Sequence, residues 1–244
     1  MEGGITMKFS WICIGLVLLF SFSVFAQEFN IVIDAEKDDF YNTLTGPDDG
    51  WVWLPSDAYN DNGDQPIPDD DWDLSANWYS AWDYDYLYIY EEVTDDFVNQ
   101  NSTTWYQNDC IDAKIDPDVY DAANVSQVFT FTIGCMDSAD VDPSVHGGIR
   151  NLVEGWTTTE TPTSDDYARR LTDDGYVIEL RLKWDWISTT DKGPAIPDVG
   201  ECFGFAIMNH DNDSDTREHS IEWAAVMTDA VWASCENHAY IELL

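Results

Sequence analysis

The sequence predicts an all-β protein: a single antiparallel β-sandwich, immunoglobulin-like or jelly-roll-like, with about nine or more strands and long acidic loops. Three observations lead to this fold class. Short segments alternate apolar with polar residues, turn-forming residues separate them, and no stretch shows a long helical period. The 244 residues suit one large all-β domain or two small ones. A hydrophobic content of 44% supplies a core, which excludes intrinsic disorder.

The first predicted elements form a hairpin around the turn Asp83-Tyr84-Asp85. In the strand after this turn, apolar residues share one face and tyrosines share the other, as expected for a half-buried strand. Two further alternating segments follow. We expect strands at Ala76–Ala81, Tyr86–Val93, residues 111–116 and Phe129–Ile133.

The second half of the chain contains the strongest hairpin signal, Asp173-Asp174-Gly175. We expect strands at Tyr167–Leu171, Tyr176–Trp184, Phe203–Ile207, Ser220–Ala224 and His238–Leu243. Long loops are expected at Gly46–Asp73, Cys135–Asp165 and His210–Glu218. None has the composition of a domain linker and there is no internal repeat, so residues 27–244 are expected to form one domain.

The N-terminal segment is predicted to be a signal peptide, residues 1–26. An apolar run, Trp11–Phe25, follows Lys8, and small residues precede a cleavage site after Ala26. Glu2 is unusual in such a segment, so Met7 is an alternative start. The run is short for a membrane span, although an uncleaved anchor is the alternative. We therefore expect a secreted protein, extracellular or at the cell surface, without membrane insertion after cleavage.

The charge excludes two classes of partner. There are 48 Asp plus Glu and 10 Lys plus Arg, which gives a formal net charge of −38. Such a surface repels the phosphates of nucleic acids and of anionic lipids. Apart from calcium sites, the acids would form a solvated, salt-adapted surface.

The cysteines suggest disulfides. Beyond the signal peptide the chain contains Cys110, Cys135, Cys202 and Cys235, an even number in an exported protein. Cys110 and Cys135 flank one predicted hairpin, so we expect them to pair, and Cys202 then pairs with Cys235. Buried thiols are the alternative.

Several segments, in order, resemble the motifs of family 9 carbohydrate-binding modules. The first is IDAEKDDFYN, which resembles "IDG-x-x-D-x-x-W", and the second is WDYDYLYI, which resembles "W-D-x-x-Y-L-Y-V". WYQNDCIDAKID then resembles "W-x-x-D-x-V-E-I-F-I-D", GYVIE resembles "G-Y-x-x-E", and GFAIMNHD resembles "G-F-x-I-x-x-N-D". The resemblance extends from Ile33 to Leu244. It implies a DOMON-like β-sandwich that binds a polysaccharide or oligosaccharide and carries calcium.

The resemblance also implies a sugar site. In the family, two Trp side chains sandwich a sugar ring, and by position these fall on Trp105 and Trp232. A pyranose stacks its C–H face on an indole, while its hydroxyls need polar partners. The family's acidic acceptor falls on Asp112 and its Asn falls near Asp229, while its Arg falls near Phe129 or Thr130, where this chain has none. The alternative for any single Trp is core packing.

Calcium ligands are expected among the aspartates, because calcium takes six to eight oxygen ligands. Asp34 and Asp38 lie at the opening turn, and Asp95 could meet Asp109. A D-x-D-x-D segment resembles an EF-hand loop, but Thr216 replaces the required Gly and the flanks read as strands. Its acids are Asp211, Asp213 and Asp215.

Catalysis is not expected. The chain has no G-x-S-x-G, H-E-x-x-H or P-loop motif, and its histidines lack metal-ligand spacing. The predicted function is thus a secreted, non-catalytic carbohydrate-binding protein. A structural or assembly subunit, on a cell surface or in a fibre, is the alternative and includes self-assembly. Haem binding is a third hypothesis, with Met208 or His210 as the axial ligand.

Overall fold

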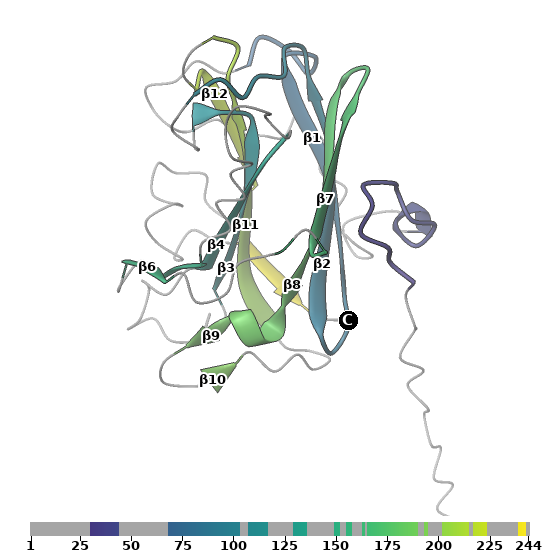
Figure 1. Cartoon of the computed structure of the whole chain (residues 1–244), viewed down its shortest axis with the longest axis vertical. Coiled ribbons are helices and arrows are strands. Elements are labelled where there is room, and N and C mark those ends of the chain that lie inside the picture. Colours follow the sequence, from purple (N-terminus) through teal and green to yellow (C-terminus); the bar gives the residue numbers. More distant parts are fainter. Residues whose placement is uncertain are drawn as a thin grey trace, which may run out of the picture.

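Two antiparallel sheets pack face to face in this computed structural model (Figure 1). This confirms the predicted all-β sandwich. The structure describes residues 30–43, 68–102, 107–116, 129–135, 149–151, 155–157, 163, 165–189, 193–194, 202–214, 217–223 and 239–242. The predicted signal peptide lies outside the described residues.

One sheet has four strands in the order β1-β2-β8-β7. The other sheet has five strands, four of them in the order β12-β11-β3-β4. The fifth strand, β13, pairs with Cys202–Phe205 at the start of β11, whereas β12 pairs with Ile207–Asp211 at its end. The four-stranded sheet comprises β1 (Leu74–Trp82), β2 (Tyr86–Asp95), β7 (Tyr167–Thr172) and β8 (Gly175–Lys183). The five-stranded sheet comprises β3 (Cys110–Asp116), β4 (Phe129–Gly134), β11 (Cys202–Asp211), β12 (His219–Trp223) and β13 (Ala239–Glu242).

All the strands expected from the sequence are present, but some bounds differ and further short strands form. β11 continues to Asp211, inside a predicted loop, because β3 and β12 supply backbone partners along that stretch. Two short strand pairs were not predicted, since strands of two or three residues carry no readable alternation. These are β5 (Ile149–Asn151) with β6 (Gly155–Thr157), and β9 (Ser188–Thr189) with β10 (Gly193–Pro194). Short 3-10 turns form at Tyr41–Thr43 (η1) and Trp184–Trp186 (η4).

The core lies between the two sheets. The inward residues of β2 and β8 meet those of β3 and β11, and aromatic rings join the sheets, with the Trp78 and Phe205 centroids 5.2 Å apart. The expected alternation is confirmed in β2, whose residues Leu87, Ile89 and Val93 face the core.

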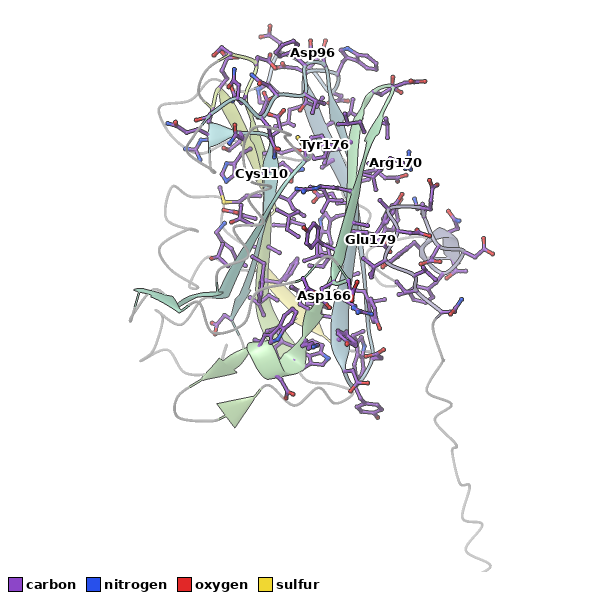
Figure 2. The ribbon with its side chains drawn as sticks, in the orientation of Figure 1. Asp96, Cys110, Asp166, Arg170, Tyr176 and Glu179 are labelled. Carbon is purple, nitrogen blue, oxygen red and sulfur yellow. The ribbon has the colours of Figure 1, made fainter. Side chains whose placement is uncertain are left out.

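The N-terminal segment covers the outer face of the four-stranded sheet (Figure 1). Its Tyr41 stacks on Tyr90, with centroids 5.2 Å apart. Glu179 of β8 accepts hydrogen bonds from the backbone N–H groups of Asp34 and Ala35, each at 3.0 Å. Arg170 donates to the Ala35 carbonyl at 3.1 Å, and Figure 2 shows Arg170 and Glu179 on this side of the sheet. A carboxylate therefore fastens the segment to the sandwich.

The predicted disulfide between Cys110 and Cys135 is wrong. Both residues are buried thiols. Cys110 is paired with Gly134, so Cys135 lies one residue further along β4 and faces the core, whereas Cys110 faces outward. Side chains on opposite faces of a sheet cannot reach disulfide geometry. Cys235 and the side chain of Cys202 lie outside the described residues, so that pairing stays a prediction.

A polar pair interrupts the core. Glu91 in β2 and Asn209 in β11 occupy positions where the alternation predicts apolar residues, and they are 0% and 2% exposed. Within the described part of the chain, neither carboxylate oxygen of Glu91 has a partner in hydrogen-bonding geometry. Burial raises the pKa of Glu91 to about 8, although the nearby Asn209 amide opposes the shift.

Glu91→Gln is expected to change how stability depends on pH. The ordinary pKa is 4.5 and the folded value is about 8, so the folded protein holds this proton more tightly. The Glu91 contribution to the free energy of unfolding therefore falls as pH rises through that window, by up to about 1.4 kcal/mol per pH unit. Gln cannot ionise, so the free energy of unfolding measured in urea should increase for the variant relative to the wild type between pH 5 and pH 8. A difference that stays constant with pH would contradict the buried-carboxyl account.

Candidate functional site

Of the residues expected to contact a sugar, only Asp112 lies in the described part of the chain. It is in β3, near the middle of the five-stranded sheet. Trp105, Asp229 and Trp232 lie outside the described residues. The position of Asp112 therefore defines the face of the sandwich on which the expected site is built.

Strand alternation makes the outer face of this sheet polar. Since Ile111, Ala113 and Ile115 face the core, Asp112 and Lys114 face outward. Asp112 is paired with Thr132 on β4 and with Met208 on β11. We call Asp112, Lys114, Thr132 and His210 the polar floor.

Three donors converge on the Asp112 carboxylate. The Thr132 hydroxyl donates to Oδ1, while the Lys114 ammonium lies 3.3 Å and His210 Nε2 lies 3.4 Å from Oδ2. Burial alone would raise the pKa of Asp112, but Lys114 and His210 outweigh it and hold that pKa well below its usual range. Asp112 is therefore ionised at neutral pH.

His210 is a neutral donor in this arrangement. Burial lowers its pKa, although Asp112 opposes the shift. Its Nδ1 lies 2.9 Å from Ser220 Oγ and 3.1 Å from Arg217 Nη1, an arginine that can only donate. Nδ1 is thus the acceptor, which places the proton on Nε2, facing Asp112. Because both ring nitrogens have protein partners, the geometry does not favour His210 as a haem ligand.

The sequence interpretation missed most of the polar floor. The family's arginine position, near Phe129 or Thr130, holds no Arg in this chain, and the cation beside Asp112 is Lys114 on the same strand. Lys114 also approaches Met208 Sδ at 2.9 Å. An outward Lys within an acidic, alternating strand resembles an ordinary surface residue, so only the register with β4 and β11 shows its role.

A second group of side chains meets at one end of the sandwich. Carboxylate oxygens of Asp95, Asp109 and Asp211, all from buried residues, lie within 4.8 Å of one another, and we call these three the carboxylate cluster. Two further groups of three carboxylates overlap with this cluster, each with oxygens within 4.8 Å of one another. They are Asp73, Asp211 and Asp213, and Asp95, Asp96 and Asp213. Figure 2 shows Asp96 at this end. The expected approach of Asp95 to Asp109 is confirmed, and Asp211 and Asp213 join it.

Backbone groups hold the carboxylate cluster in place. Asp109 accepts hydrogen bonds from the amides of Asn99 and Asn212, the latter at 2.6 Å. Asp95 Oδ1 accepts from the Phe97 amide at 2.8 Å, whereas Oδ2 has no hydrogen-bond partner in the described structure. Asp95 is 3% exposed, so this oxygen lies in the protein interior without compensation.

The cluster resists ionisation unless a cation is present. Burial and, after it, repulsion from neighbouring acids raise the pKa of Asp95 to about 7 and that of Asp211 to about 8. The same causes raise the pKa of Asp109 to about 10, against the two amide donors. Converging carboxylate oxygens of this kind fit a hard divalent cation.

The remaining expected metal ligands are not brought into this cluster. Asp34 Oδ1 accepts the Glu36 amide at 2.9 Å and Asp38 Oδ2 accepts the Val32 amide at 3.0 Å, so both stabilise the N-terminal segment. Among the described residues, neither belongs to a group of three acids close enough to share an ion. Asp215 lies outside the described residues.

Comparisons with known proteins agree with this architecture. Residues 33–243 match the family described as "Carbohydrate family 9 binding domain-like". A search of curated proteins finds no match.

Solved structures share the fold. A family 9 carbohydrate-binding module from Caldicellulosiruptor kristjanssonii in complex with cellotriose aligns with a TM-score of 0.59 and 20% identity, over 87% of this chain and 89% of that one. A family 9 module of the same organism in complex with glucose aligns with a TM-score of 0.56 and 21% identity, over 88% of this chain and 91% of that one. A candidate carbohydrate-binding protein from Bacteroides uniformis aligns with a TM-score of 0.51 and 8% identity, over 88% of this chain and 98% of that one.

The described residues were also searched for membrane spans. None of the helices among them is long and apolar enough to cross a bilayer.

Asp112→Asn is expected to lower the free energy of unfolding by about 3–5 kcal/mol, because it leaves the buried Lys114 ammonium without its carboxylate. The double variant Asp112→Asn/Lys114→Met should recover most of this loss in urea unfolding at pH 7. Glu92→Gln is the matched control: it breaks the more exposed Lys37–Glu92 pair and should cost at most about 1 kcal/mol. Equal losses in the two single variants would contradict the account.

Proposed function

Because the chain belongs to the carbohydrate family 9 binding domain-like family, we propose that it is a secreted, non-catalytic carbohydrate-binding protein with structural calcium. The observation that carries the proposal is the polar floor, a buried group on the outer-face side of a sheet in which one ionised carboxylate meets several donors. Sugar hydroxyls need both donors and acceptors. About four acceptor sites surround a carboxylate, and three donors already occupy Asp112, so about one position remains for a ligand hydroxyl.

The stacking surfaces are proposed to be Trp105 and Trp232. Trp105 lies between Ser102 and Gln107, and Ser102 and Asn108 hold each other through two hydrogen bonds of 2.8 and 3.0 Å. These bonds join two described residues, one before and one after Trp105 in the sequence ahead of β3. The related modules with cellotriose and glucose support a glucan oligosaccharide as the first ligand to test.

Calcium is proposed to bind the carboxylate cluster. Asp95, Asp109 and Asp211 would supply the buried ligands, and Asp73, Asp96 and Asp213 the outer ones. The ion would supply the positive charge that lets these carboxylates ionise inside the protein. Its role is structural, because the chain's own residues provide the sugar contacts.

Affinity electrophoresis and calorimetry with cellotriose test the sugar site. Trp105→Ala and Trp232→Ala should each weaken binding by about 2- to 10-fold or more, since an aromatic contact contributes about 0.5–1.5 kcal/mol beyond its buried area. Trp72→Ala is the control, because Trp72 is 52% exposed and precedes β1 of the other sheet. Cellotriose should be recovered intact. Retardation on no polysaccharide would instead favour the assembly-subunit hypothesis.

Calcium is expected to raise the melting temperature at pH 7.5 by about 5–10 °C at 100 times its Kd. The effect should shrink at pH 5. The cluster's raised pKa values mean that the folded protein binds protons more tightly than the unfolded chain, and calcium must displace those protons.

Asp95→Asn should remove most of the calcium effect and stabilise the calcium-free protein at pH 7.5, because one buried charge is gone. Asp85→Asn, at the exposed tip of the β1–β2 hairpin, should keep the full calcium effect. A melting temperature that is the same with calcium and with EDTA would refute the calcium site.

A further inference from the structure

The polar floor and the carboxylate cluster share two neighbouring strands. In the segment that leads into β3, Asp109 of the cluster is followed three residues later by Asp112 of the floor. In β11, His210 of the floor is directly followed by Asp211 of the cluster. The register pairs His210 with Cys110, so the cluster lies at the end of the same ladder whose outer face carries the floor.

A hydrogen-bonded loop connects the two groups a second time. The amide of Asn212 donates to Asp109 Oδ1 at 2.6 Å, and the amide of Glu218 donates to the Asp211 carbonyl at 2.8 Å. Between these two contacts in the chain, Arg217 reaches His210 Nδ1 at 3.1 Å. The described residues of the turn after β11 therefore contact a cluster carboxylate through Asn212, the Asp211 backbone through Glu218 and the floor through Arg217.

The connector between β2 and β3 is bound to this turn as well. The side-chain amides of Asn99 and Asn101 each donate to the Ser214 carbonyl at 2.8 Å. Asn212 Nδ2 approaches Asn101 Oδ1 at 3.3 Å, and the Cys135 amide donates to the Asp109 carbonyl at 3.0 Å. Strands β3, β4 and β11 are thus held together around Asp109.

The charge of a bound cation would act on the ends of strands β3 and β11, where the carboxylate cluster lies. A cation bound between the carboxylates of Asp109 and Asp211 would attract both of them and so link the ends of β3 and β11. The His210–Asp112 contact, at 3.4 Å, spans the same two strands and is long for a hydrogen bond. The same link would hold His210 against Asp112.

From this geometry we infer that cation binding at the carboxylate cluster and sugar binding on the polar floor are positively coupled. The inference rests on the proposed function, since it concerns the regulation of that sugar site. Coupling between sites is reciprocal: calcium and sugar must change each other's affinity by the same factor. Calcium is then more than a stabiliser, because it sets the affinity of the sugar site.

The test is a calorimetric cycle on the full chain with cellotriose and calcium chloride. Cellotriose affinity is measured in saturating calcium and in EDTA, and calcium affinity with and without saturating cellotriose. We expect both ratios to agree at about fivefold or more. Cellotriose affinity that is the same in calcium and in EDTA, while calcium still raises the melting temperature, would overturn the coupling and leave both proposed sites standing. Absence of cellotriose binding in both conditions would overturn the sugar function and the coupling together.

Two variants locate the coupling. Asp95→Asn should make cellotriose binding independent of calcium, although the hydrogen bond described for Asp95 goes to the Phe97 amide and not to the polar floor. Asn101→Ala removes two side-chain contacts between the connector and the turn but no carboxylate. It should lower the coupling factor while both ligands still bind, and Asn101 is exposed, so the fold is expected to persist. Asp85→Asn should leave the factor unchanged. An unchanged factor in Asn101→Ala would overturn the assignment of the coupling to this turn.

Discussion

The register of β3 between β4 and β11 is the constraint on which the rest of the structure depends. Successive residues of β3 alternate between the core and the outer face, so one strand supplies apolar packing and the Asp112–Lys114 pair. A slip of one residue would bury that pair in the core and expose Ile111. The pairing of Met208 with Asp112 and of His210 with Cys110 fixes the register from the other side.

Buried acids are compensated in three different ways. Asp112 has a full cation and two further donors, and its pKa falls. Glu179 has only two backbone amides, and burial raises its pKa to about 7. Asp95 and Asp211 have further carboxylates beside them, and burial with repulsion raises their pKa values to about 7 and about 8. In this protein an ammonium and an imidazole offset the burial of Asp112, whereas two backbone amides do not offset the burial of Glu179.

Alternation and turn chemistry predicted the strands and the fold, because both are local properties of the chain. The meeting of Asp95 with Asp109 was also predictable, since only a short connector separates them. The contribution of Asp211 to the same cluster depends on β11 lying beside β3, a pairing between residues about a hundred positions apart that no local pattern encodes. The disulfide prediction failed for a related reason: symmetric positions in a hairpin do not specify the face on which each Cys lies.

The net charge of −38 bears on why the polar floor is built as it is. A neutral sugar is not repelled by an acidic surface, but its hydroxyl oxygens need donors, and a chain with 48 acids has acceptors in excess. Of only 10 Lys plus Arg residues, Lys114 and Arg217 both lie at the floor. Arg217 donates to His210 Nδ1 and thereby keeps the proton on Nε2, facing Asp112. Lys114 and His210 therefore give Asp112 donors in a chain where acceptors are in excess, while Arg170 and Arg181 pair with acids elsewhere.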